Sequence, residues 1–234
     1  MHTNNSYGLS NGFCSVICEV PPSPSPNFDE REREIDMLIL HYTGMKTAGE
    51  ALARMCDPES KVSAHYMLEE DGKIHRLVAE EKRAWHAGIS YWRGVENLNH
   101  NSIGIEIVNP GHEWGYRKFT KAQYDALIPL CAAIKNKYQI PDINIIGHSD
   151  IAPERKQDPG ELFDWKLLAE NGVGLFANAA QPSSHSTPQL TDLGYRSHDT
   201  HSITAFQRHW RQNKIDGIWD EECGMILTNL LAKL

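Results

Sequence analysis

Short apolar runs recur along the first two thirds of the chain, and each predicts a buried strand. Residues 36–43 (DMLILHYT) and 143–148 (INIIGH) are too short for helices, and both predicted strands end at a histidine, His41 and His148. The stretch SIGIEIVNP, residues 102–110, alternates strictly. Its two faces carry Ile103, Ile105 and Ile107 on one side and Gly104, Glu106 and Val108 on the other. Residues 63–78 predict two strands around a turn at Asp71-Gly72.

Two longer stretches show the spacing of helices. Residues 47–56 (TAGEALARMC) form the first, and Asp57-Pro58 ends it. The second begins at Thr120, a good N-cap, and continues to Ile140. Its apolar stripe consists of Tyr124, Leu127, Ile128, Cys131 and Ile134, with a kink expected at Pro129. Helices that alternate with strands, together with one hairpin, predict an α/β fold in which helices pack on a mixed β-sheet.

The pattern changes after Phe176. Residues 177–188 are small and polar, which is typical of a linker. Residues 189–234 then carry two helical stripes, Ile203/Phe206/Trp210 and Ile226/Leu227/Leu230/Leu231, with the turn KIDGIWDEE between them. This part predicts a small all-α domain of three helices. At the other end, the Pro/Ser-rich and then charged residues predict an extended arm over 1–30, which leaves 31–176 as the main domain.

Composition narrows the choice of partners and compartment. The 234 residues include 31 acidic and 23 basic side chains, a net charge of −8, which argues against a nucleic-acid partner. Five scattered cysteines are not a disulfide framework, and Cys14 and Cys18 lack the second pair of ligands that a zinc knuckle needs. The first residues have neither the basic start nor the apolar run of a signal peptide, and no transmembrane segment is expected. A cytoplasmic location is therefore predicted.

Candidate chemistry lies where the predicted strands end. Loops at strand ends can present functional side chains from a rigid scaffold, and GHSDIAPERKQDPG (147–160) is a polar segment directly after a strand. The residues alone leave simpler explanations open. A single histidine at a strand end is commonly structural, and Asp158 in KQDPG also fits an ordinary turn.

Six motifs in order give a specific resemblance. They are LILHYT, SAHYMLEEDGKIHRLV, AWHAG, NSIGIEIVN, GHSDIAPERKQDPG and the following Phe163-Asp164-Trp165. Together, over residues 35–170, they resemble the zinc-dependent N-acetylmuramoyl-L-alanine amidases, a family shared with peptidoglycan recognition proteins. Within that family the chain most resembles the branch that cleaves anhydromuropeptides or stem peptides.

The resemblance implies that His41, His148 and Asp158 bind zinc. Two imidazoles and a carboxylate leave a fourth tetrahedral position for water, which is the pattern of a catalytic zinc site. Glu106 matches the acid/base residue, and burying a carboxylate between isoleucines without such a role would be costly. The alternative is that Gly104, Glu106 and Val108 face a solvated groove. Lys156 would stabilise negative charge on the carbonyl oxygen under attack.

Further roles follow from the same resemblance. Trp85 and His86 would lie along the substrate groove, although Trp85 fits a core position equally well, and Asn109 would orient the peptide. His65 and His75 would be structural or on the substrate side rather than ligands. Arg155 is either a solvated base or a contact for a product carboxylate.

The tail is similar to the small helical peptidoglycan-binding domain at Leu193-Gly194-Tyr195, Ala205-Phe206-Gln207 and Asp216-Gly217. It departs from that pattern at IWDEECG, where glycine and threonine are usual. A structural cap on the catalytic domain is the alternative.

The predicted reaction is hydrolysis of the amide between N-acetylmuramic acid, or its anhydro form, and L-alanine in peptidoglycan or muropeptides. Two alternatives remain at this point: a peptidoglycan-binding protein without activity, and a zinc hydrolase of another acyl-amino acid amide. If the substrate consists of wall fragments that are being recycled, a cytoplasmic location is expected. Intact wall as substrate, the wall-binding-like tail and an arm that could follow a removed leader fit the periplasm or cell envelope. The sequence makes no prediction of oligomeric state.

Overall fold

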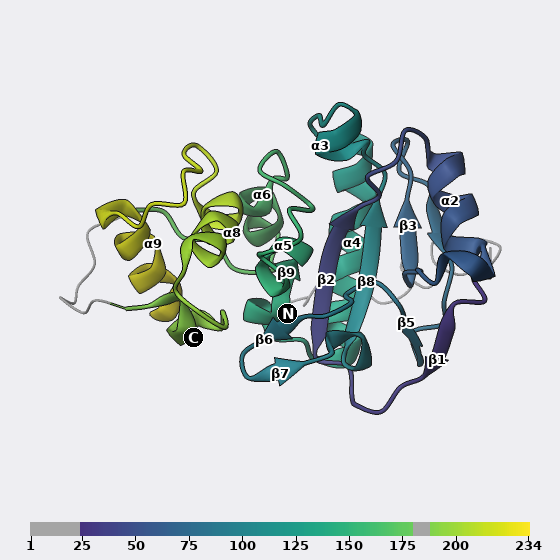
Figure 1. Cartoon of the computed structure of the whole chain (residues 1–234), viewed down its shortest axis with the longest axis horizontal. Coiled ribbons are helices and arrows are strands. Elements are labelled where there is room, and N and C mark those ends of the chain that lie inside the picture. The colour runs from purple at the N-terminus through teal and green to yellow at the C-terminus, as the bar shows by residue number, and fades with distance from the viewer. Residues whose placement is uncertain (1–23, 180–187) are drawn as a thin grey trace, which may run out of the picture.

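The computed structural model describes residues 24–179 and 188–234, and its centre is a mixed β-sheet (Figure 1). Within those residues the main sheet has five strands in the order β4-β3-β8-β2-β9. The strands are β2 (Met37–Tyr42), β3 (Tyr66–Leu68), β4 (Ile74–Arg76), β8 (Ser102–Ile107) and β9 (Ile145–Gly147). β3, β8, β2 and β9 run parallel to their neighbours, whereas β4 pairs antiparallel with β3 across the predicted Asp71-Gly72 turn. The predicted α/β fold with a mixed sheet is confirmed.

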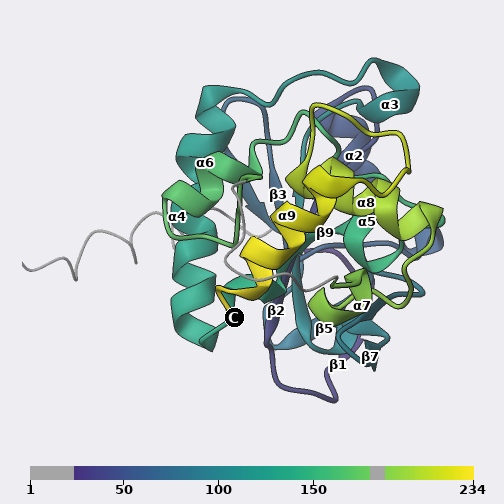
Figure 2. The same ribbon diagram turned by 90° about the vertical axis from the view of Figure 1, so that its left-hand side faces the viewer.

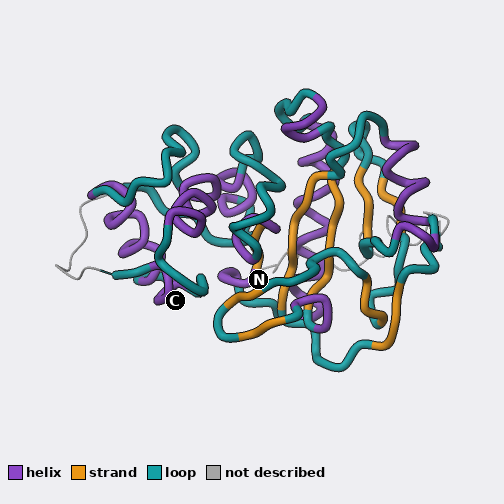
Figure 3. Tube along the Cα trace, viewed as in Figure 1, coloured by secondary structure: helices purple, strands orange, loops and turns teal. Residues whose placement is uncertain are grey.

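Helices and short ribbons surround this sheet, as Figure 3 shows by colour. The helices are α2 (Ala48–Cys56), α3 (Gly111–Trp114), α4 (Lys121–Tyr138), α5 (His148–Ile151), α6 (Trp165–Glu170), α7 (Leu190–Leu193), α8 (Thr200–Trp210) and α9 (Glu221–Leu231). Three short 3-10 turns cover Pro58–Ser60, Leu98–His100 and Asp142–Asn144. Two ribbons pair β1 (Phe28–Glu30) with β5 (Lys82–Ala84), and β6 (Tyr91–Trp92) with β7 (Val95–Glu96). No helix of the described residues has both the length and the apolar character that crossing a bilayer requires.

The alternation of β8 separates a core face of the sheet from a functional face. Ile103, Ile105 and Ile107 are fully buried in one hydrophobic cluster with the apolar side of α4. α4 begins as predicted, because Thr120 accepts from the Gln123 backbone N–H and the Gln123 side chain returns the bond in a capping box. Its buried positions include Leu130, whereas Ile128 of the predicted stripe is only partly buried. The opposite face of β8 is thereby left for Gly104 and Glu106.

The three helices of residues 188–234 share a core with the main sheet. Phe206 of α8 and Leu227 of α9 belong to one buried cluster with Met37 and Ile39 of β2 and Ile146 of β9. Figure 2 shows α8 and α9 in front of this end of the sheet. The helices are therefore packed on the sheet through buried apolar side chains.

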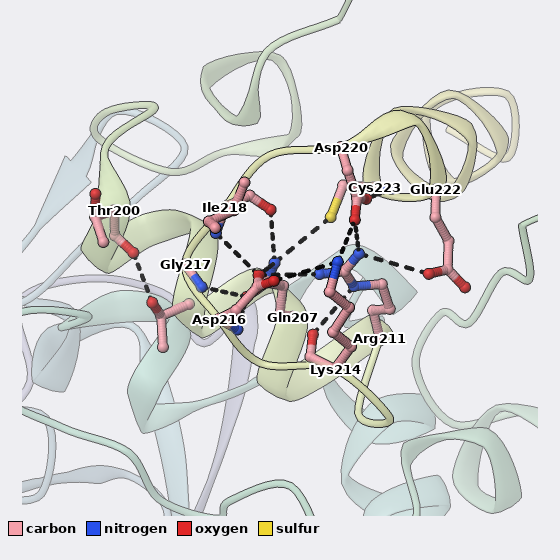
Figure 4. Close-up of polar contacts among 11 residues, drawn as sticks. Thr200, Gln207, Arg211, Lys214, Asp216, Gly217, Ile218, Asp220, Glu222 and Cys223 are labelled. Carbon is pink, nitrogen blue, oxygen red and sulfur yellow. Dashed lines mark hydrogen bonds and ion pairs between the residues drawn. The ribbon is translucent and has the colours of Figure 1, made fainter.

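A closed network of polar groups fixes the turn between α8 and α9 (Figure 4). The buried Gln207 amide oxygen accepts from the backbone N–H groups of Asp216 and Gly217, and its NH₂ group donates to Asp216 Oδ1 and the Ile218 carbonyl. Arg211, whose side chain is 1% exposed, pairs with Asp216, Asp220 and Glu222. The turn is thus stabilised from within the tail itself.

The predicted arm and the predicted linker are only partly covered by the described residues. Residues 1–23, including Cys14 and Cys18, lie outside the described residues, as do 180–187 of the predicted linker. Residues 24–30 of the predicted arm are anchored to the main domain. β1 pairs with β5, and Asn27 is buried with its amide donating to the carbonyls of Asp57 and Val62.

Candidate active site

The parallel strands bring the predicted residues to one edge of the sheet. His41 of β2 and Glu106 of β8 are direct register partners, so their side chains leave the same face side by side. Leu40 is paired with Gly147, the last residue of β9, and His148 follows it immediately. His148 opens α5 instead of ending the strand, a shift of one residue from the prediction. Carboxyl ends of parallel strands are a common place for a ligand site.

Three donor atoms converge at this edge. His41 Nδ1 lies 2.9 Å from His148 Nδ1, and each of these nitrogens lies 3.0 Å from Asp158 Oδ2. All three residues are buried, and they are the group among the described residues in which a metal ion could be held. We call these three atoms the donor triangle.

The far side of His148 shows why the donor triangle is suited to a cation. His148 Nε2 lies 3.1 Å from the Ala87 carbonyl oxygen. A carbonyl only accepts, so Nε2 carries the proton and donates it. In the neutral ring, Nδ1 then presents a bare lone pair toward a carboxylate and a second imidazole. Converging lone pairs repel one another unless a positive charge lies between them.

Burial and charge fix the protonation of the other two donors. Burial and, to a smaller extent, nearby His148 lower the pKa of His41 to about 4, although Asp158 acts in the opposite direction. Burial would raise the pKa of Asp158, but His148 and His41 outweigh it and hold that pKa far below its usual range. At neutral pH the site therefore offers an uncharged imidazole and an ionised carboxylate, the forms that bind metals.

Glu106 lies beside the donor triangle in an environment that favours its protonated form. Burial raises its pKa well above the usual value and the negative Asp158 adds to the rise, whereas the Lys156 ammonium lowers it. Its Oε2 atom is buried and has no hydrogen-bond partner among residues 24–179 and 188–234. A carboxyl oxygen of this kind is available for a proton transfer.

A groove of about 720 Å³ opens above these residues. Glu106, His148 and Asp158 lie at its lining, together with Lys156, Trp85 and residues of α2. The exposed Lys156 is close enough for its charge to act on both His41 and Glu106. The groove therefore combines the donor triangle, an isolated carboxyl group and a cation.

Several predicted side chains have partners of their own. Trp85 lines the groove, and its indole N–H donates to Asp29 Oδ1 at 3.1 Å. Asn109 is buried; its NH₂ group donates to the Arg117 carbonyl and its Oδ1 accepts from the Gly111 N–H. Its orienting role toward a peptide stays a prediction.

His65, His75 and Arg155 are similarly occupied. His65 Nδ1 accepts from the Gly104 N–H and His75 pairs with Glu69, so neither joins the donor triangle. Arg155 donates to the carbonyls of Ala87 and Ile89, which makes it a clamp on that loop, a role not among the predicted alternatives. Its pKa is lowered by burial, although Asp158 acts against this.

The Ala87 carbonyl is a functional group with no signal in the sequence. Any residue offers a backbone oxygen, so no side-chain type marks it. Tyr42 was also missed: it lines the groove and its hydroxyl contacts His112 Nδ1 at 3.0 Å, while His112 Nε2 pairs with Glu161. Its place directly after His41 was the available signal.

Fold and site together define a protein of the mixed α/β type with a group of residues suited to a metal ion. Residues 31–161 match the family model described as N-acetylmuramoyl-L-alanine amidase. The chain belongs to this N-acetylmuramoyl-L-alanine amidase family.

Curated proteins and solved structures agree with the family. The chain is 37% identical over 232 residues to the N-acetylmuramoyl-L-alanine amidase AmiD of Escherichia coli, covering 85% of this chain and 83% of AmiD. It is 41% identical over 188 residues to the 1,6-anhydro-N-acetylmuramyl-L-alanine amidase AmpD of Citrobacter freundii, covering 72% and 94%. The structure of E. coli AmiD with the substrate anhydro-N-acetylmuramic acid-L-Ala-D-gamma-Glu-L-Lys superposes with a TM-score of 0.76 at 33% identity, over 88% of this chain and 98% of that one.

Proposed function

We propose that the protein hydrolyses the amide bond between N-acetylmuramic acid, or its anhydro form, and L-alanine, with zinc held by His41, His148 and Asp158. The observation that carries this proposal is the donor triangle, three atoms about 3 Å apart beside a carboxyl group with a free oxygen. The substrates named for AmiD and AmpD belong to those proteins, and membership of the same family supports their use here.

The residues fit zinc in number, type and spacing. A tetrahedral zinc site with bonds of 2.0–2.1 Å has donors about 3.3 Å apart, close to the separations observed. Two imidazoles and one carboxylate are a ligand set of catalytic zinc, which keeps one position open. When bound, zinc polarises a carbonyl and lowers the pKa of a water molecule to about 7.

Glu106 is assigned the proton transfers. In its ionised form, which the nearby Lys156 ammonium favours, its Oε2 atom can take a proton from the attacking water. Burial and Asp158 raise the pKa of the carboxyl group, so it can then retain that proton. The same group then delivers the proton to the nitrogen of L-alanine, which leaves as a neutral amine. His41 and Glu106 are register partners, so the strands fix this group next to the donor triangle.

Lys156 is assigned the stabilisation of negative charge. Its ammonium lies on the groove within electrostatic range of Glu106. As charge grows on the carbonyl oxygen under attack, a fixed cation stabilises the transition state more than the substrate.

The groove supports an acidic peptide as the bound group. Lys46 and Arg54 line it in addition to Lys156, and these three cations suit the carboxylates of a stem peptide. The carboxylates Glu50 and Glu113 also line the groove, so its character is mixed and not uniformly basic.

Paired assays test the proposal against its two alternatives. Wild type, His148→Ala and Glu106→Gln are compared for zinc content and for release of stem peptide from anhydromuropeptide, from insoluble wall and from unrelated acyl-amino acid amides. We expect release by wild type, loss of zinc and activity in His148→Ala, and loss of activity with zinc retained in Glu106→Gln. Binding of muropeptide without cleavage would identify a binding protein, and cleavage of unrelated amides only would identify a different hydrolase.

Substrate form and compartment belong to the same proposal. Preference for soluble anhydromuropeptide would favour recycling in the cytoplasm, and preference for insoluble wall would favour the cell envelope. Pelleting of the inactive Glu106→Gln protein with wall, before and after disruption of the tail surface, tests peptidoglycan binding by residues 189–234 against a purely structural cap.

A further inference from the structure

Both imidazoles of the donor triangle are held from behind by the same short segment. His41 and His148 each turn Nδ1 toward Asp158 and Nε2 away from it. The Nε2 atom of His148 reaches the Ala87 carbonyl at 3.1 Å, and that of His41 reaches His86 Nδ1 at 3.1 Å. His86 was predicted to lie along the substrate groove, and it is one of the residues that line it. It is nevertheless only 8% exposed, and its Nδ1 atom lies behind the His41 imidazole.

The direction of the His41–His86 contact follows from the next two groups in the chain of contacts. Ser102 Oγ lies 2.6 Å from the Leu98 carbonyl, which can only accept, so the hydroxyl proton is used there. Ser102 Oγ then accepts from His86 Nε2–H at 3.3 Å. In the neutral ring His86 Nδ1 has no proton, and it accepts from His41 Nε2–H.

This relay places the proton of His41 on Nε2 and leaves Nδ1 bare. His41 therefore has one tautomer that satisfies the contact behind its ring, and in that tautomer Nδ1 presents its lone pair to the donor triangle.

The segment behind the ligands is itself fixed. Asn99 Oδ1 accepts from the backbone N–H groups of both His86 and Ala87, at 3.1 and 2.8 Å. Arg155 donates to the Ala87 carbonyl from the other side. These hydrogen bonds hold the backbone of His86 and Ala87 in place behind the two ligand imidazoles.

The lack of a side chain at Gly104 is independent evidence for the position of the His86 imidazole. A Cβ atom on Gly104 would come closer to His86 Cγ than real Cβ atoms approach another atom. Gly104 is in an ordinary strand conformation within β8, so its backbone does not require glycine. The space over Gly104 is the space that His86 occupies.

We propose that His86 is a positioning residue for metal binding: it accepts the Nε2 proton of His41, fixes that tautomer and so presents Nδ1 to the ion. This inference rests on the proposed zinc site. Partners behind a ligand histidine typically contribute 10–100-fold to metal affinity.

The test is zinc affinity measured by competition with a chromophoric chelator, with unfolding of the metal-free proteins followed in parallel. His86→Phe fills the space but cannot accept a proton, and we expect about 10–100-fold weaker zinc binding. His86→Asn places an amide oxygen near the position of Nδ1, and we expect it to restore most of the affinity. His75→Phe is the matched control, a buried histidine outside this relay, and its zinc affinity should equal that of wild type.

Gly104→Ala is the second variant, since it displaces His86 without removing a polar atom, and it should also weaken zinc binding. If His86→Phe fails to fold, the zinc affinity of Gly104→Ala tests the inference in its place. Zinc affinity unchanged in a folded His86→Phe protein, or equally weak in His86→Asn and His86→Phe, would overturn the inference. Failure of the proposed function is recognised separately, because wild type itself would then bind no zinc.

Discussion

The side chains of Asp150 and His209 meet in the interior of the protein, with His209 Nδ1 2.8 Å from Asp150 Oδ2. Asp150 lies in α5 two residues after His148, and His209 lies in α8 of the tail. The ring of His209 is stacked between Trp165 and Trp210, with centroid separations of 3.8 and 3.6 Å. This contact joins the tail directly to the helix that begins with a proposed zinc ligand.

Replacing Tyr195 by phenylalanine should destabilise the fold through this carboxylate. The Tyr195 hydroxyl donates to Asp150 Oδ1 at 2.6 Å, and Asp150 is fully buried. Loss of the donor leaves a buried carboxyl oxygen short of a partner, so we expect the free energy of unfolding to fall by about 1–3 kcal/mol. Chemical denaturation measures this change. Tyr91→Phe, at a partly exposed tyrosine that stacks with Arg196, is the control and should have little effect. Equal stability of Tyr195→Phe and wild type would contradict this account of Asp150.

The sequence predicted individual strands because short apolar runs and alternation are local patterns. β2, the β3–β4 hairpin and β8 lie where those patterns predicted them, and α4 is capped at Thr120 as its residue type predicted. The boundary at His148 was wrong by one residue, since Gly147 ends the strand and the histidine side chain gives no sign of the helix that follows.

The convergence of His41, His148 and Asp158 rested on the family resemblance, because strand order cannot be derived from one sequence. Pairing of β2 with β9 brings His41 and His148 together, and the Ser149 N–H donates to the Asp158 carbonyl, which holds Asp158 beside His148. The supporting groups were beyond prediction for a different reason. A backbone carbonyl such as that of Ala87 has no sequence signature, and the partner of Asp150 is 59 positions away.

Lys156→Met should lower kcat for muropeptide hydrolysis by about 100- to 1,000-fold, the usual loss when one group that stabilises a developing oxyanion is removed. Methionine keeps the length of the side chain but not its charge. Zinc content should be unchanged, because Lys156 is exposed and contributes no atom to the donor triangle. Lys166→Met, at an exposed position on α6, controls for loss of a surface charge. A Lys156→Met enzyme with the wild-type kcat would remove this residue from the mechanism.

Glu80 should make the stability of the fold sensitive to acid. Burial would raise its pKa, but donation from Lys137, Tyr66 and Tyr138 outweighs burial and lowers it. Since the folded-state pKa lies below the unfolded-state value, this stabilisation is present above about pH 4.5 and is lost as the pH falls through the folded-state pKa.

Urea unfolding of metal-free protein between pH 7 and pH 3.5 tests whether the stabilisation by Glu80 is lost as the pH falls. Glu80→Gln should be less stable than wild type at pH 7, by about 1–3 kcal/mol, and the difference should shrink toward pH 3.5. The exposed Glu59→Gln is the control. A gap between Glu80→Gln and wild type that stays constant over this range would show that the Glu80 charge is not the cause.

Removal of metal should lower both activity and thermal stability. Zinc at 100 times its dissociation constant stabilises the folded state by about 2.7 kcal/mol, so the melting temperature should rise with zinc concentration. Treatment with a chelator should abolish hydrolysis, and zinc should restore it. Magnesium should not, because it prefers an octahedral shell of oxygen ligands to two imidazoles. Full activity in protein shown to be free of metal would contradict the proposed site.

The core that α8 and α9 share with β2 and β9 has a consequence for how the protein meets a large substrate. When a flexible linker joins a binding domain to a catalytic domain, the binding domain can hold a polymer while the catalytic domain samples many positions around it. Here the tail is packed on the sheet through apolar contacts and through Asp150. Any polymer bound on its outer surface would therefore reach the groove at one fixed orientation and distance. The choice among cleavage points along the polymer would then depend on that fixed geometry, and a longer connection at 180–187 would not change this choice.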